Sequence, residues 1–152
     1  MIKNYTSSVP VERTIMRIES VLVQGGATNI SKDYKEGTLK AIFFSIVMPD
    51  GKRVSIRLPA NADKVYEVMQ ARIKKPRKLT MFKVVQQADR TAWKLVQDWV
   101  EVQMSLITMQ KADFLQVFLP YVWDGNRTFY TSLKESNFKL LSQNNGTAEE
   151  PT

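Results

Sequence analysis

The residues best suited to bind a polyanion are concentrated in one stretch of the chain. Between residues 72 and 83 there is no acid, and the basic residues are Arg72, Lys74, Lys75, Arg77, Lys78 and Lys83. The net charge of the whole chain is +7, so this stretch carries most of the basic excess. Clustered cations displace the counterions condensed on a phosphate backbone. The stretch, which Pro76 would hold extended, is therefore a candidate nucleic-acid contact, and the alternative is a solvated linker between two halves of the chain.

Two further cations lie on a predicted β-hairpin. Arg53 and Arg57 occupy alternate positions of its second strand, so both side chains point to one face. Phe43 of the first strand either shares that face as a stacking surface for bases or lies under a second packed layer, the reading we favour. We predict that both arginines and the basic stretch contact the backbone of DNA or RNA.

The composition leaves few groups for catalysis. The chain has no cysteine and no histidine, which removes thiol nucleophiles, thiolate metal sites and the commonest general base. Asp98 and Glu101 lie three residues apart, but a hard cation needs more than two carboxylates, so we interpret them as a solvated helix face. No glycine-rich phosphate loop is present. We expect a non-enzymatic protein without cofactor or metal.

The longest helical pattern runs over residues 88–109 and organises the predicted fold. Its apolar positions form two adjacent rows, while Lys94, Asp98 and Glu101 fall on the opposite side. The rows consist of Trp93, Leu95, Val96, Trp99, Val100, Val102, Met104, Leu106, Ile107 and Met109. A helix with so broad an apolar face must be covered by other elements. We predict a central helix with Trp93 and Trp99 in the core.

The remaining patterns place shorter elements around this helix. A first helix is capped by Ser8 and stops at Gly25. The hairpin turns at Pro49-Asp50-Gly51, and a weaker strand over residues 28–34 precedes the hairpin. The other signals are a second helix capped by Asn61, a short helix ended by Pro120 and a last helix capped by Thr128 that carries Phe129, Leu133 and Leu140.

The fold class predicted from these elements is α+β. It has an N-terminal helix, a two- or three-stranded antiparallel sheet, and a helical C-terminal half around one long central helix. We expect a single domain over residues 1–141 and a disordered tail over residues 142–152, which lacks large apolar side chains.

Two resemblances accompany these patterns. The element order over residues 10–73 is similar to that of a double-stranded-RNA-binding domain, but the second helix opens with Asn61-Ala62-Asp63-Lys64 and the family's lysine clamp and histidine are missing. The strings Tyr5-Thr6-Ser7-Ser8-Val9-Pro10-Val11-Glu12, Arg90-Thr91-Ala92-Trp93, Asp98-Trp99-Val100-Glu101 and Leu119-Pro120-Tyr121 resemble an uncharacterised family of bacteriophage, prophage and mobile-element proteins. This resemblance implies a phage setting and no activity.

The functional prediction is a small basic accessory protein that binds nucleic acid and has phage or mobile-element origin. The alternative is a module that binds a host protein or sequesters a small ligand to antagonise host defence, because broad apolar faces also suit a partner or a homo-oligomer. No apolar run approaches a membrane span, so we expect no membrane contact and a cytoplasmic location.

Overall fold

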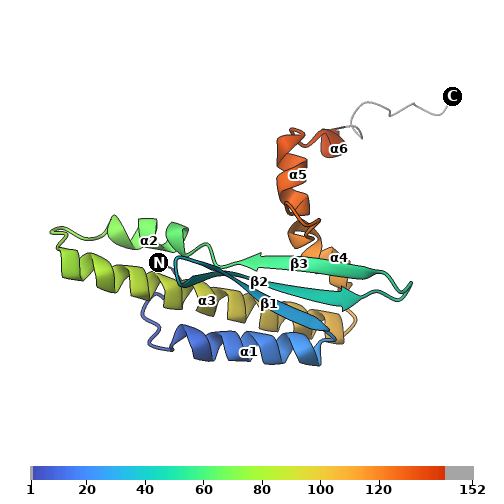
Figure 1. The fold of residues 1–152 in the computed structure, drawn as a ribbon, viewed down its shortest axis with the longest axis horizontal. Helices are drawn as coiled ribbons and strands as arrows, with labels where there is room; N and C mark the ends of the chain where they lie inside the picture. Colours follow the sequence, from blue (N-terminus) through green and yellow to red (C-terminus); the bar gives the residue numbers. More distant parts are fainter. Residues whose placement is uncertain (1, 143–152) are drawn as a thin grey trace.

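The computed structural model describes residues 2–142 and has the α+β architecture predicted from the sequence (Figure 1). The elements in chain order are α1 (Val11–Gln24), β1 (Asn29–Lys35), β2 (Thr38–Val47), β3 (Arg53–Pro59), α2 (Ala62–Gln70), α3 (Lys78–Thr108), α4 (Phe114–Phe118), the 3-10 helix η1 (Leu119–Tyr121), α5 (Phe129–Glu135) and α6 (Lys139–Ser142). Residues 143–152 of the predicted tail lie outside the described part, and Ser142 is the last residue of α6.

The sheet has three antiparallel strands in the order β1-β2-β3, which confirms the weaker predicted strand. Phe44 pairs with Ile56 across β2 and β3, and Ile42 pairs with Leu58. Because side chains alternate along a strand, these four share the face that packs into the core with α1 and α3. The predicted turn at Pro49-Asp50-Gly51 is present, and Met48 N donates to Lys52 O at 2.8 Å.

The core is centred on Trp93 of α3, not on both predicted tryptophans. Trp93 is 0% exposed in one cluster with Ile18 of α1 and Ile42 of β2. Trp99 is only half-buried, and Val102 is 56% exposed. The prediction that both apolar rows of α3 are buried is therefore wrong in part. Leu95 and Trp99 pack against the edge of the core, but together with exposed Val102 they also line a surface pocket.

Helix α3 begins at Lys78, well before the predicted start at Ala88. The added turns pack against α2, which explains why they are helical although Leu79, Phe82 and Val85 remain exposed. The expectation that the basic stretch is extended throughout is thus wrong in part, since Lys78 and Lys83 lie on a helix.

The helix caps differ from the sequence prediction at two of three positions. Helix α1 follows Pro10 without any side-chain cap, so Ser8 does not cap it. Asn61 occupies the position before α2, but its side chain makes no capping hydrogen bond. Thr128 does cap α5, because its Oγ1 accepts from Thr131 N at 3.3 Å. The single last helix of the prediction is divided into α5 and α6.

The polar stripe of α3 holds the N-terminal segment instead of facing solvent alone. Asp98 accepts hydrogen bonds from Lys3 Nζ and, at 2.8 Å, from Asn4 Nδ2. Glu101 accepts from Arg17 Nε of α1 at 2.8 Å, and Thr91 Oγ1 donates to Asn4 O at 2.9 Å. The interpretation of Asp98 and Glu101 as solvated carboxylates is therefore wrong in part, because both remain partly exposed but also tie other segments to α3.

Replacing Trp93 by alanine tests where the core lies. Trp93→Ala should lower the free energy of unfolding by about 3–5 kcal/mol, because the truncation leaves a cavity that the packed sheet and helices cannot fill. The matched control is Trp99→Ala, which removes the same atoms from a half-buried position and should cost clearly less. Urea titrations of both variants measure the difference, and equal losses would contradict the assignment of the core.

Replacing Asp98 by asparagine tests the N-terminal anchor. Partial burial opposes ionisation of Asp98, but the hydrogen bonds from Lys3 and Asn4 and the charges of Lys3 and Lys94 outweigh it, so the pKa of the carboxyl is lowered from its usual 3.8. A lowered folded-state pKa contributes stability above the unfolded value, and this stability disappears as the pH falls through the folded value.

Asp98→Asn should therefore reduce the melting temperature at pH 7, and the deficit should shrink as the pH falls from about 4 through the lowered folded-state pKa, below which Asp98 of the parent protein is protonated in both states. The control Glu67→Gln removes a carboxylate from an exposed pair with Lys64 and should change little at any pH. A deficit for Asp98→Asn that stays constant down to low pH would count against the anchor.

Candidate functional site

Six cations form a cluster at the turn between α2 and α3, at one end of the long axis of the molecule (Figure 1). We call this cluster the basic tip; it consists of Arg72, Lys74, Lys75, Arg77, Lys78 and Lys83. All six residues are exposed. Among residues 2–142 none of them has a carboxylate oxygen within 4.0 Å, whereas Lys3, Arg17 and Lys32 each do. Their charges are therefore available to an external anion.

The basic tip lies in a part of the sequence that is poor in acids. Glu67 and Asp89 are the acids that bracket the tip in the sequence, and Glu67 is already 3.8 Å from Lys64. Burial raises the pKa of the Asp89 carboxyl, although the charges of Lys40 and Arg90 oppose the shift. No acid therefore lies between Glu67 and Asp89, the span of sequence that contains the tip.

The N-terminal end of α3 opens into the basic tip. Arg77 precedes the helix in an extended conformation and no side chain caps the first turn. The first backbone N–H groups of a helix lack internal partners, and the aligned peptide dipoles of a long helix make this end favourable for anions. An anion bound between Arg77 and Lys78 would meet both these N–H groups and the side-chain cations.

The two arginines of the hairpin have a different environment. The guanidinium carbon of Arg57 lies 5.8 Å from the ring centroid of Phe43 and 5.7 Å from that of Trp123. These distances are within the range of cation–π attraction. Arg57 Nη2 is also 3.8 Å from Asp33 Oδ2. Arg57 is therefore part of a packed cluster with a compensated charge, while Arg53 is exposed at the start of β3.

Phe43 has a partner that the sequence patterns did not indicate. The rings of Phe43 and Trp123 meet edge to face at 5.4 Å, so Phe43 is half-buried against a second layer. Trp123 reaches this face because Trp123 N donates to Ser55 O at 2.8 Å and Val122 forms a β-bridge with Ile56. A single residue extending a sheet edge has no periodic signal, so its position could not be read from the sequence.

The structure does not bring the eight predicted contact residues together. The basic tip and the β2–β3 turn lie at opposite ends of the long axis (Figure 1), and Arg53 follows this turn directly. The tip alone brings six predicted residues together at one place. Arg53 and Arg57 thus belong to a separate surface, and their predicted role in binding is not supported by proximity to the tip.

A pocket also opens between α3 and the end of β3, and the sequence analysis missed it because it assigned Trp99 and Leu95 to the core. Its lining includes Trp99, Leu58, Tyr121 and Asn61. The sequence feature that could have indicated this pocket is the width of the apolar face of α3, which exceeds what one sheet and one helix can cover.

Other kinds of site find no support within the described residues. No group of three or more metal-ligating side chains gathers in residues 2–142, and no helix there is long and apolar enough to cross a membrane. A comparison with protein-family models gave no match, and comparisons with curated proteins and with solved structures gave no significant match. The resemblance to phage proteins stays a prediction.

Proposed function

We propose that the protein is a small, non-catalytic nucleic-acid-binding protein that holds the phosphate backbone of DNA or RNA at its basic tip. The observation that carries this proposal is the cluster of six exposed cations without a carboxylate partner in the described part of the chain. Cations already paired with protein carboxylates gain less from a phosphate, because the existing pair must first be broken.

The arrangement suits contacts to phosphates more than contacts to base edges. Lysine and arginine side chains on an exposed turn and on the first turns of a helix bind by charge, which positions a protein on a strand without reading its sequence. Binding should therefore depend strongly on salt and weakly on sequence. The proposed setting, an accessory role in a phage or mobile element within the host cytoplasm, rests on the resemblance described for the sequence.

The salt dependence of binding tests this proposal. Replacing Lys74, Lys75, Arg77 and Lys78 together by glutamine should reduce the log-log salt slope by about 2–4, since each neutralised phosphate contributes about 0.7–0.9. The loss of affinity should be similar for all sequences. Fluorescence anisotropy of labelled single- and double-stranded oligonucleotides between about 50 and 200 mM salt gives both slopes.

A charge-matched control separates the tip from net charge. The variant with Arg13, Lys35, Lys111 and Lys134 replaced by glutamine also loses four exposed cations, but from scattered positions. It should keep nearly the whole salt slope, and so should Arg53→Gln. If the control loses as much as the tip variant, binding follows net charge alone; if the parent protein does not bind at about 50 mM salt, the proposal fails.

One observation favours a second candidate function, that of a protein-binding module. Leu79, Phe82 and Val85 follow one another at three-residue spacing on α3, so they share one face, and they are 66%, 59% and 46% exposed. An exposed apolar row next to the tip suits a host protein or a second copy of the chain. Light scattering of the parent protein and of Phe82→Ser distinguishes a homo-oligomer from a monomer that awaits another partner.

A further inference from the structure

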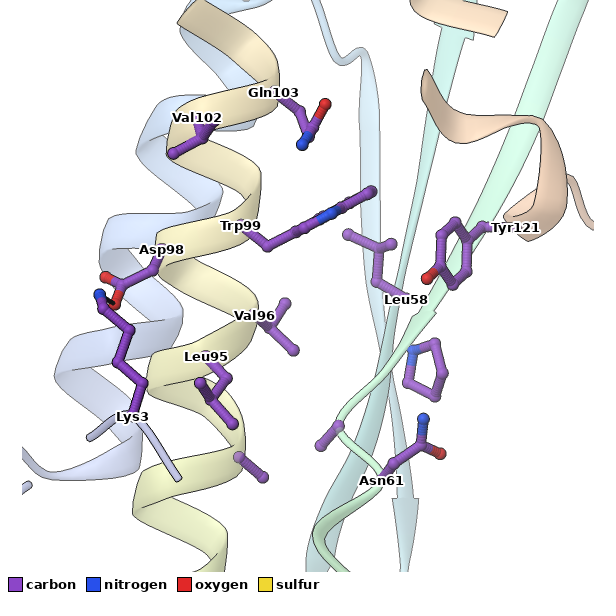
Figure 2. Close-up of a pocket in the computed structure, with 13 residues that line it drawn as sticks. Lys3, Leu58, Asn61, Leu95, Val96, Asp98, Trp99, Val102, Gln103 and Tyr121 are labelled. Atoms are coloured by element: carbon purple, nitrogen blue, oxygen red, sulfur yellow. Dashed lines mark hydrogen bonds and ion pairs between the residues drawn. The ribbon is translucent and has the colours of Figure 1, made fainter. Parts of the chain in front are cut away.

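A pocket of about 590 Å³ lies between α3 and the end of β3 (Figure 2). Its lining residues on α3 fall between Ala92 and Gln103, whereas the basic tip ends at Lys83. The volume of the pocket lies within the range of about 300–1,000 Å³ that is usual for small-molecule sites. Val96 and Trp99 enter it from α3, Leu58 lies on the sheet side, and Tyr121 stands across from α3.

The walls of the pocket are apolar and aromatic. The ring of Trp99 extends from α3 above Val96 and Leu58 (Figure 2). It meets the ring of Phe118 at 5.4 Å and that of Tyr121 at 5.5 Å, both edge to face, so neighbouring rings fix its orientation. A fixed, half-buried indole beside an open space is a stacking surface for a flat ligand.

Four polar groups at the pocket have no hydrogen-bond partner within residues 2–142. They are the side-chain amides of Asn61 and Gln103, the hydroxyl of Tyr121 and the indole N–H of Trp99. None of the four is sealed inside the protein, since Thr14 Oγ1 is the one buried side-chain polar atom without a partner among the described residues. These groups can therefore reach a bound molecule.

Asn61 is placed for binding more than for capping. Its backbone has φ 52° and ψ 40°, a left-handed conformation that asparagine tolerates better than most residues. An asparagine before a helix ordinarily accepts a hydrogen bond from the first turn, but Asn61 makes no such bond to α2. The amide at the mouth of the pocket thus keeps both its donor and its acceptor capacity.

The charged residues of the pocket are already paired with each other. Lys3 Nζ donates to Asp98, and Asn4 Nδ2 donates to the same carboxylate at 2.8 Å. The pair leaves no uncompensated charge in the lining, which contains no other ionised side chain. An anionic or cationic ligand would gain no counterion there, so the chemistry favours a neutral ligand.

We infer that this pocket binds a neutral, planar heteroaromatic group of the nucleobase type. Such a group stacks on Trp99, fills the apolar space above Leu58, and pairs the donors and acceptors of its edge with the amide of Asn61 and the hydroxyl of Tyr121. Amide side chains match heterocycle edges because they offer a donor and an acceptor side by side. The inference does not rest on the basic tip, because it involves other residues and no phosphate.

Titration with adenosine and with uridine, followed by the indole N–H signals in nuclear magnetic resonance spectra, tests the inference. The Trp99 signal, assigned with the Trp99→Phe variant, should shift and saturate, while the signal of buried Trp93 should stay in place. Cyclohexanol, which is apolar but not planar, should shift Trp99 little at equal concentration. No saturable shift with either nucleoside, or an equal response to cyclohexanol, would overturn the inference.

Two conservative variants test the polar contacts without emptying the pocket. Asn61→Gly removes the amide and accommodates the positive φ, and Tyr121→Phe removes only the hydroxyl. Each should weaken nucleoside binding about three- to tenfold, the usual range for one hydrogen bond. The matched controls are Asn137→Gly, which also has positive φ at 55°, and Tyr130→Phe, both outside the pocket lining. Unchanged affinity in both pocket variants would contradict the assigned contacts.

The same assay distinguishes the two sources of such a group. Short single-stranded oligonucleotides that bind at Trp99 much more tightly than the nucleosides would assign the base to a strand. Equal affinity would assign it to a free nucleoside or base. The variant with four glutamines at the basic tip should keep nucleoside binding in either case, so a failure of the proposed function leaves this result distinguishable.

Discussion

The burial of Trp93 between α1 and the sheet is the constraint on which the other features depend. Trp93 is 0% exposed, and its neighbours Ile18 and Ile42 are equally buried, so α3 can neither rotate nor slide without exposing a large aromatic side chain. With α3 fixed by its middle, its N-terminal turns extend beyond the sheet and carry Lys78 and Lys83 to one end of the molecule. The same orientation places Trp99 at the edge of the core, against Phe118 and on the side of α3 that faces β3.

The ion pairs around α3 add a second level of order to this arrangement. Asp98 holds Lys3 and Asn4, and Glu101 holds Arg17 of α1. These contacts consume the acids in the middle of α3, and no acid exists between Glu67 and Asp89. The carboxylates in the middle of α3 therefore hold other segments of the chain, while the cations at its N-terminal end have no carboxylate partner among the described residues.

Local patterns predicted much of the fold because they are short-range consequences of backbone geometry. The alternation of Ile42, Phe44 and Ile46 and the turn at Pro49-Asp50-Gly51 indicate the hairpin directly. The order of elements and the α+β class follow from such signals. The cap at Thr128 is of the same kind, whereas Ser8 does not cap α1 because Pro10 occupies the cap position directly before Val11.

Features that depend on contacts between distant residues could not be read in this way. Periodicity placed Trp93 and Trp99 on one broad apolar face, but only the positions of α1 and β3 decide which tryptophan is buried. Likewise, the basic composition of residues 72–83 is visible in the sequence. That α3 already begins at Lys78, inside this stretch, depends on packing against α2. Trp123 and the pocket near Asn61 arise from chain segments brought together by the fold.

The central claim is that the basic tip holds a nucleic-acid backbone. The most direct measurement is a map of backbone amide shifts in isotopically labelled protein on addition of a short single-stranded oligonucleotide. The account predicts that the largest shifts gather in residues 72–83, that the N–H groups at the start of α3 move with them, and that added salt reverses both. Shifts that leave residues 72–83 unchanged while other surfaces respond would contradict it.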